Sequence, residues 1–347
     1  MQNNAILATM PLGFQWQTAD PFLFCVHHLD LYPQGENMRA PQNALAGRDL
    51  GQDFTPKDGW RMYHGEHVPG FPNHPHRGFE TVTVVRQGFV DHSDSMGAAG
   101  RYGAGDVQWM TAGSGVQHAE MFPLIESTRA NTLELFQIWL NLPAKNKMVK
   151  PHFKMLWAKD IPKIQVSDAA GNPTTVEVIA GDYAGKQALT PPPDSWAAEK
   201  ANAVSIWHID IPENGEWLLP AESSPVNRYL YFYSGETLNV AGYATAHHTG
   251  LKLDARTALP LKALGAPAKM LLLQGKPIGE TVAQYGPFVM NTRAEIEQAF
   301  ADTSRWLANG QRTRFGGWPW PSAEPVHARE RGRFARHADG REETQSG

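Results

Sequence analysis

Short runs of β-branched and aromatic residues, each followed by Gly or Pro, are the feature that most restricts how this chain can fold. The 32 glycines and 26 prolines are spread at short intervals along the 347 residues. Clear examples of such runs are 79–85, 133–140, 204–211 and 229–233. Runs of this length between turn residues are typical of strands. The spacing favours an all-β sandwich or barrel over alternating strands and helices.

The length allows about two domains, each able to bury its own core. Residues 142–147, LPAKNK, separate a first set of strand-like runs from a second set that begins near Ile164. We therefore expect an N-terminal domain over residues 1–150 and a C-terminal domain over 151–310. An Arg-rich tail follows over 311–347.

One segment near the end of the second set has helical periodicity. Thr292 and Glu295 have the spacing of a capping box, which predicts a helix start. One face of the expected helix carries Ile296, Phe300, Thr303 and Leu307. Asn309-Gly310 ends the pattern. The helix is expected to pack across a sheet.

The tail carries few apolar side chains, apart from the WPWP sequence at 318–321 and Phe334. WPWP is a candidate apolar anchor, and residues 342–347 are expected to be disordered. Deletion of residues 322–347 is therefore expected to leave metal content and thermal stability nearly unchanged.

Charge and cysteine content exclude several classes of protein. The formal net charge of −4 gives no support for direct nucleic-acid binding. The single cysteine, Cys25, excludes an intramolecular disulfide, a zinc finger built on thiolates and an iron–sulfur cluster. No uncharged apolar run approaches the roughly 20 residues that span a bilayer. We expect a soluble cytoplasmic protein, a monomer without membrane contact, whose metal ligands, if any, are His and carboxylate.

Two histidine motifs carry the clearest chemical signal. His74 and His76 are two residues apart, and so are His118 and Glu120 after a glycine-rich turn. Side chains two apart in an extended chain point to the same face, so each pair can converge on one ion. Three imidazoles and a carboxylate suit divalent Fe, Mn, Ni, Cu or Zn better than Ca or Mg. On a six-coordinate ion they leave two positions open for substrate and for water or dioxygen.

These segments resemble the signature of pirins, a branch of the cupin superfamily. The resemblance rests on HPHRGFETVT at 74–83, GDVQWMTAGSG at 105–115 and HAEM at 118–121, with support from 135–143 and 286–292. It implies two tandem cupin (jelly-roll) β-barrels followed by the helix and tail. It also implies one metal per chain in the first barrel, usually iron, held by His74, His76, His118 and Glu120.

Other side chains near the motifs have alternative interpretations. If side chains alternate between the two faces of the extended chain, Glu80 lies on the same face as the ligands, either as a ligand or as a hydrogen-bond partner of one. The same parity predicts an apolar cup made of Val82, Val84, Val116 and Phe122. Arg77 either orients an anionic substrate or makes a structural ion pair, the second being favoured.

The remaining histidines are weaker candidates. His64 and His67 are expected to be loop residues. In the second half, His208 is isolated and the adjacent His247 and His248 would face opposite ways on a strand. The second barrel is therefore expected to hold no metal.

For function, the resemblance implies quercetin 2,3-dioxygenase activity, with a flavonol and O2 as substrates and Glu120 as the general base. The alternative is a metal- or redox-sensing regulator that acts through a protein partner. A cupin isomerase or decarboxylase is a third possibility, and its activity would not need oxygen.

Overall fold

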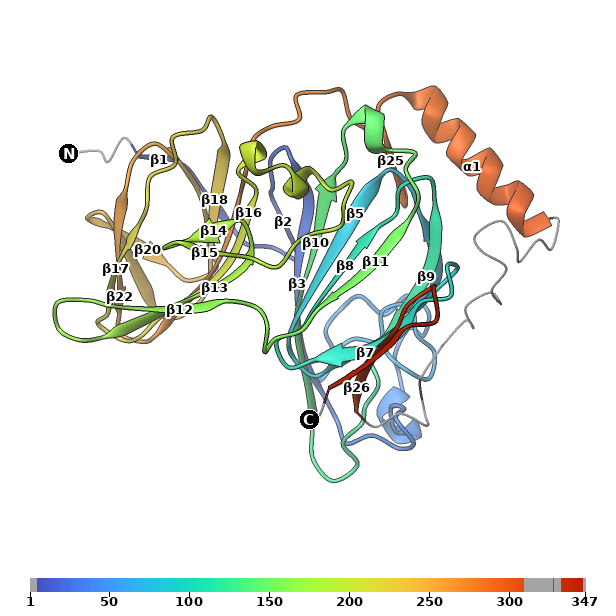
Figure 1. Cartoon of the computed structure of the whole chain (residues 1–347). Helices are drawn as coiled ribbons and strands as arrows, with labels where there is room; N and C mark the ends of the chain where they lie inside the picture. Colours follow the sequence, from blue (N-terminus) through green and yellow to red (C-terminus); the bar gives the residue numbers. More distant parts are fainter. Residues whose placement is uncertain (1–4, 309–326, 328–331, 346–347) are drawn as a thin grey trace. The chain divides into compact units, whose positions relative to one another are not determined.

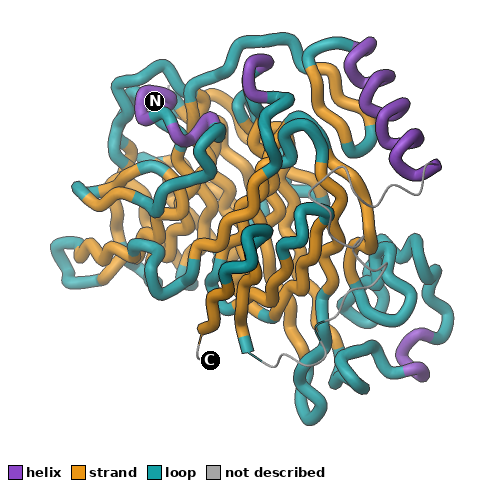
Figure 2. The backbone as a smooth tube through the Cα atoms, turned by 45° about the vertical axis from the view of Figure 1, so that its right-hand side comes forward, coloured by secondary structure: helices purple, strands orange, loops and turns teal. Residues whose placement is uncertain are grey.

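The computed structural model describes residues 5–308, 327 and 332–345. Strands dominate the described chain, and α1 (Arg293–Ala308) is its one long helix (Figure 2). The all-β prediction is confirmed. No described helix has the length and apolar character needed to cross a membrane.

The backbone forms two compact units that are not continuous in sequence. One, here the N-barrel, consists of residues 27–137, 142–158 and 280–347, and the other, the C-barrel, of residues 1–26, 138–141 and 159–279. The boundaries drawn from the sequence, at 150 and 310, assign residues 1–26, 138–141, 151–158 and 280–310 differently. Each unit is described below by itself.

Two six-stranded sheets contain the strands of the N-barrel (Figure 1). The first has the order β11 (His152–Leu156), β8 (Val107–Thr111), β5 (Phe79–Gln87), β10 (Asn131–Asn141), β3 (Phe22–Tyr32) and β2 (Gln15–Trp16). It also includes residues 15–16, 22–26 and 138–141, which are counted with the C-barrel. The second has the order β27 (Glu342–Gln345), β26 (Arg333–Arg336), β7 (Ala99–Gly103), β6 (Phe89–Asp94), β9 (Val116–Met121) and β4 (Gly70–His76). Their core joins both sheets, for example Val85 and Leu135 of the first with Val90 and Tyr102 of the second.

Helix α1 begins at the expected place. Glu295 N–H donates to Thr292 Oγ1 at 3.3 Å, and Thr292 N–H donates to Glu295 Oε2 at 2.8 Å, which confirms the capping box. Ile296 is buried in a small cluster with β25 (Phe288–Met290), which pairs with β24 (Ala283–Tyr285). Phe300 remains 38% exposed, although its ring contacts that of Phe288. The side chain of Leu307 lies outside the described residues.

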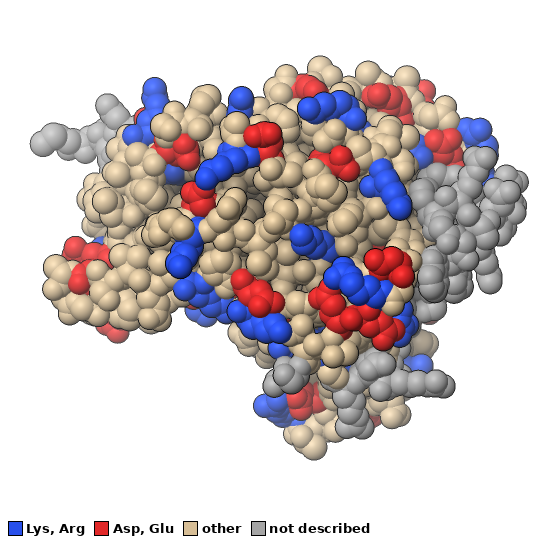
Figure 3. All heavy atoms as spheres, in the orientation of Figure 1, with Lys and Arg blue, Asp and Glu red and all other residues tan. Residues whose placement is uncertain are grey.

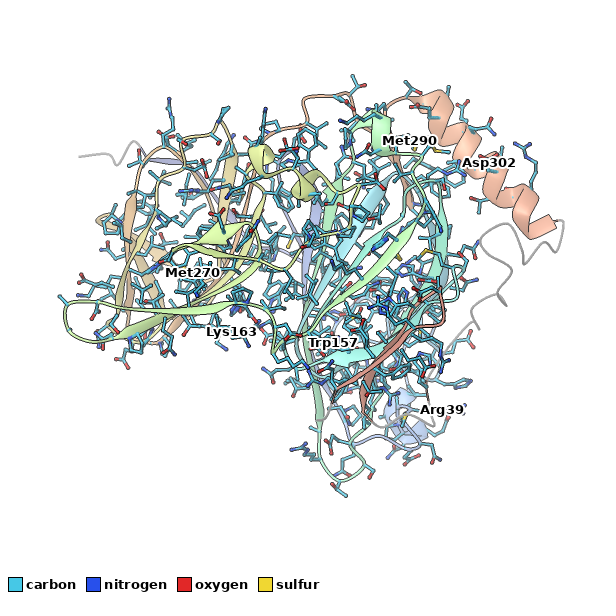
Figure 4. All side chains as sticks on the ribbon, viewed as in Figure 1. Arg39, Trp157, Lys163, Met270, Met290 and Asp302 are labelled. Carbon is cyan, nitrogen blue, oxygen red and sulfur yellow. The ribbon has the colours of Figure 1, made fainter. Side chains whose placement is uncertain are left out.

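The expected disorder of the tail is wrong for residues 342–345. Strand β26 pairs antiparallel with β7, placing Phe334 opposite Arg101, and β27 pairs with β26. Ala335 is fully buried in the N-barrel core. Trp157, labelled in Figure 4, donates from its indole nitrogen to Glu343 at 2.6 Å. The tail therefore completes a sheet; its WPWP sequence lies outside the described residues.

The C-barrel has a seven-stranded and a four-stranded sheet. The larger has the order β1 (Ile6–Pro11), β21 (Thr249–Leu253), β18 (Asn227–Ser234), β23 (Ala268–Gly275), β16 (Ser205–Ile211), β13 (Pro173–Ala180) and β12 (Lys163–Ser167). The smaller has the order β17 (Glu216–Leu219), β22 (Leu259–Leu264), β19 (Thr237–Val240) and β20 (Tyr243–Ala246). Buried side chains from both sheets form its core, among them Met270, labelled in Figure 4.

Short elements complete the two units. They are the hairpin β14 (Asp182–Tyr183) with β15 (Lys186–Gln187) and the 3₁₀ turns η1 (Gln42–Leu45), η2 (Ala144–Asn146), η3 (Trp196–Ala198) and η4 (Lys200–Asn202). Residues 190–195, with three prolines, contribute no strand and lead into η3, as a proline-rich loop should.

Candidate metal centre

Two neighbouring strands of the N-barrel bring the two histidine motifs together. In the β4–β9 ladder His74 lies directly opposite His118, while Phe71 lies opposite Glu120. Three residues of β4 thus match two of β9, which is a β-bulge. The bulge sets the register in which the two motifs face each other.

Three imidazole nitrogens converge at this point. Nε2 of His74 lies 3.1 Å from Nε2 of His76 and 2.9 Å from Nε2 of His118. Nδ1 of His74 donates to the carbonyl oxygen of Pro72 at 2.9 Å, and Nδ1 of His76 to that of Pro287 at 3.3 Å. In both rings the proton is therefore on Nδ1, and the lone pair of Nε2 points to the meeting place.

Burial keeps these rings neutral. Desolvation lowers the pKa of His74 to about 4 and the pKa values of His76 and His118 well below the usual range, and neighbouring histidines add to the effect in all three. The unprotonated Nε2 atoms of His74 and His76 face each other 3.1 Å apart, and their lone pairs repel unless a cation lies between them. The donor set therefore fits a bound metal ion.

The spacing also indicates a coordination geometry. With metal–nitrogen bonds of about 2.1 Å, nitrogens 90° apart are separated by roughly 3.0 Å and those of a tetrahedron by roughly 3.4 Å. The two measured separations, 3.1 and 2.9 Å, match the first value. An ion held by these three histidines would have positions left for other ligands.

Glu120 lies beside the three histidines without belonging to their cluster. Its Oε2 is 3.8 Å from Nε2 of His118. The ligand atoms of His74, His76 and His118, in contrast, all lie within 4.8 Å of one another. Thr83 Oγ1 donates to Glu120 Oε1 and Gln137 Nε2 to Glu120 Oε2, both at 3.1 Å. Burial raises the pKa of Glu120, an effect opposed first by His92 and then by these two hydrogen bonds.

A fourth histidine stands next to the cluster, and the sequence reasoning missed it. His92 on β6 lies opposite Glu120, and its ring is 5.4 Å from that of His118. Its Nε2 is 3.0 Å from Asp94 Oδ2, and its ring stacks on Phe153. The signal was available, since His92 and Asp94 are two apart on a strand, as the ligand pairs are.

The predicted position of Glu80 and the predicted valine cup are wrong in part. Thr83 bonds to Glu120, so Val82 and Val84 lie on the opposite face of β5. Glu80, on the same face as the valines, accepts a hydrogen bond from Thr111 at 2.7 Å. The prediction assumed that side chains alternate without interruption from β4 through β5. The turn at residues 77–78 interrupts this alternation, so the faces of β5 are the reverse of those predicted.

Aromatic rings, rather than valines, lie against the site histidines. The ring of Phe71 is 6.4 Å from that of His74, and the ring of Phe79 is 5.1 Å from that of His76. The site therefore combines aromatic contacts with a polar group formed by Thr83 and Gln137 around Glu120.

Two of the other candidates have structural contacts. Arg77 Nη1 donates at 2.8 Å to Asp302 of α1, which is labelled in Figure 4, and Arg77 Nε donates to the carbonyl oxygen of Ser114 at 2.7 Å. The structural interpretation of Arg77 is thus supported. His64 is exposed in a loop, where its Nδ1 lies 2.7 Å from the carbonyl oxygen of Gly51.

The C-barrel histidines do not form a cluster of the same kind within the described residues. His208 is buried and its Nε2 contacts Tyr233 Oη at 2.5 Å. His247 and His248 lie between β20 and β21, with ring centroids 5.0 Å apart.

The double-barrel architecture with a histidine cluster in one barrel defines a bicupin. Residues 14–140 match the model of the pirin family, and residues 206–306 match that of the pirin C-terminal cupin domain. The chain belongs to the pirin family, as the sequence motifs predict.

Several proteins share this similarity over most of their length. A pirin-like protein of Solanum lycopersicum is 39% identical over 257 residues, covering 71% of this chain and 79% of that protein. A Pseudomonas aeruginosa protein with the provisional name quercetin 2,3-dioxygenase is 38% identical over 235 residues, covering 67% and 77%. The crystal structure of a quercetin 2,3-dioxygenase from Acinetobacter baumannii aligns with a TM-score of 0.68 and 27% identity, covering 90% and 98%.

Proposed function

We propose that this protein is a metal-dependent dioxygenase of the quercetin 2,3-dioxygenase type. The observation that carries the proposal is the convergence of three neutral Nε2 atoms with a buried carboxylate 3.8 Å from one of them. The names of the P. aeruginosa relative and of the A. baumannii structure support the substrate class. A cytoplasmic location and a monomeric state remain predictions.

The proposed ligands are His74, His76 and His118, with Glu120 as the fourth, and iron(II) is the proposed ion. A bound divalent ion would supply Lewis-acid chemistry, lowering the pKa of a flavonol hydroxyl that reaches it. The aromatic rings of Phe71 and Phe79 suit a flat aromatic substrate better than a sugar phosphate.

Glu120 is the proposed proton acceptor. Its raised pKa makes it a better base than an exposed carboxylate, and the bonds from Thr83 and Gln137 fix its orientation. Because both of those side chains are neutral, they hold the carboxylate without adding a charge to the site.

The metal assignment is tested by elemental analysis of the purified full chain. We expect one equivalent of metal per chain, reduced at least about tenfold in His118→Ala, since a ligand nitrogen is lost. The control is His247→Ala, which removes an exposed histidine of the C-barrel and should keep one equivalent. Two equivalents per chain, or full metal in His118→Ala, would contradict the assignment.

The role of Glu120 is tested with Glu120→Gln. We expect the variant to retain metal on the three histidines but to oxidise quercetin about a hundredfold or more slowly, the range for a positioned proton acceptor. Oxygen uptake and carbon monoxide release measure turnover. Metal retention with unchanged turnover would exclude Glu120 as the base.

The same assay distinguishes the alternative functions. A metal-loaded unmutated chain with no turnover would favour the regulatory protein, whereas activity without oxygen would favour an isomerase or decarboxylase. On the face drawn in Figure 3, Lys and Arg alternate with Asp and Glu over the described residues, so this face offers no broad basic surface to nucleic acid.

A further inference from the structure

The C-barrel contains a cavity of about 690 Å³ that the proposed reaction does not use. That volume is within the range of small-molecule sites in proteins. Its lining residues all lie between Ala180 and Gln274, so the cavity belongs to the C-barrel alone. The candidate metal centre lies in the other unit.

One wall of this cavity is the polar end of the barrel interior. Arg228 alternates along β18 with Leu230 and Phe232, which belong to the C-barrel core, so Arg228 also points inward. Gln274 lies opposite Arg228 on β23, and Ser205 lies opposite Gln274 on β16. Further along, these three strands contribute apolar side chains to the core. At the end that lines the cavity they contribute a guanidinium, an amide and a hydroxyl.

The guanidinium of Arg228 is buried without a counter-ion. It is 1% exposed, and no described carboxylate oxygen lies within 4.0 Å of its nitrogens. Its Nε donates to Gln274 Oε1 at 2.6 Å and its Nη1 to the carbonyl oxygen of Pro220 at 2.8 Å. Nη2 has no partner among the described residues.

Burial of an unpaired charge is costly, which points to a ligand. Desolvation lowers the pKa of Arg228 to about 10, although Glu222 and Asp254 act in the opposite direction. The two neutral acceptors fix the plane of the guanidinium and leave a donor for an anion.

The remaining walls restrict what that anion can be. Trp207 and Tyr183 line the cavity with their rings 5.2 Å apart, and half of the other lining residues are Ala, Val, Leu or Pro. The indole N–H of Trp207 is buried without an acceptor in the described part of the chain. Lys200, Asp182, Glu199 and Glu222 also line the cavity, and Lys200 pairs with Asp182 at 3.3 Å. Three anionic groups thus accompany two cations, which disfavours a dianion.

We propose that the C-barrel binds a small organic monoanion, a carboxylate carried on an apolar or aromatic body, in the cavity that ends at Arg228. The carboxylate pairs with the guanidinium, and the body lies against Trp207 and the aliphatic walls. This site is independent of the proposed dioxygenase reaction.

The test is isothermal titration of the full chain with benzoate and with benzamide, its neutral analogue of the same size. Benzoate should bind at least about tenfold more tightly, because only it can form the charge-assisted bond. Inorganic phosphate is the third ligand and should bind more weakly than benzoate. Equal affinity for benzoate and benzamide, or tighter binding of phosphate, would overturn the proposal.

Amino-acid substitutions test whether benzoate binds in this cavity. Arg228→Gln should weaken benzoate at least about tenfold, while Arg293→Gln, which removes a 92% exposed arginine from α1, should not. Ala198→Trp adds bulk at an exposed lining residue and should block the cavity with Arg228 intact, which keeps the test valid if Arg228→Gln does not fold. Unchanged binding in Ala198→Trp, or loss only in His118→Ala, would place benzoate elsewhere and refute the proposal.

Discussion

Arg333 connects the tail to the interior of the N-barrel, and its substitution is the most direct test of the corrected tail structure. Its Nη1 lies 2.9 and 3.0 Å from the two carboxylate oxygens of Asp106, which is fully buried. Arg333→Ala would leave Asp106 with bonds from the backbone N–H groups of Gly103 and Ala158. Loss of one partner of a buried ion pair costs about 3–5 kcal/mol.

The expected cost is smaller here because the Arg333 side chain is 19% exposed. We expect about 2–3 kcal/mol, which for a unit of roughly 200 residues lowers the thermal transition by about 5–10 °C. The matched control is Arg336→Ala on the same strand. Arg336 pairs with Glu342, and the two side chains are 46% and 58% exposed, so the shift should be under about 2 °C.

Differential scanning calorimetry of both variants and of a chain ending at residue 331 measures these shifts. Truncation should destabilise at least as much as Arg333→Ala, because it also uncovers β7 and removes the buried Ala335 from the core. Equal small shifts for the two arginine variants, together with an unchanged transition in the truncated chain, would refute the docked tail and restore the expectation drawn from the sequence.

Two further predictions concern buried positions. Gly78 has φ +84°, and an added Cβ would collide with the carbonyl oxygen of Val289, so Gly78→Ala should lower the free energy of unfolding by about 2–4 kcal/mol. The control Gly171→Ala, at φ +86° with no atom within 4 Å, should lower it by only about 1–2 kcal/mol. Equal losses for the two variants in urea denaturation would contradict the steric argument. Cys25 is fully buried and burial raises the pKa of its thiol, so a thiol reagent should modify it only after unfolding; rapid labelling of the native chain would show that β3 opens there.

Sequence reasoning succeeded where one strand carries the signal. His74 and His76 share the inner face of β4, and parity along a single strand predicts this without any other information. Parity failed for Val82 and Val84, because the turn at 77–78 lies between them and the histidines.

Contacts between distant segments were beyond such reasoning. Pro287, which accepts a hydrogen bond from His76, is 211 residues away, and Asp106 is 227 residues from Arg333. Nothing in a short polar tail shows which strand edge it will pair with, since register is decided by the partner's side chains as well as its own. The contacts of Arg228 were missed for a similar reason, because Pro220 and Gln274 become its neighbours only in the folded sheet.

The pairing of β26 with β7 has a consequence for how the protein is made. Synthesis proceeds from the N-terminus, so all segments of the C-barrel, which end at Gly279, emerge from the ribosome before residues 280–345 do. Until Arg333–Arg336 has been translated, β7 is an uncovered sheet edge, open to pairing with another chain. The N-barrel, most of which is encoded before residue 159, is therefore completed last, and its exposed edge is the point at which a stalled or truncated product would aggregate.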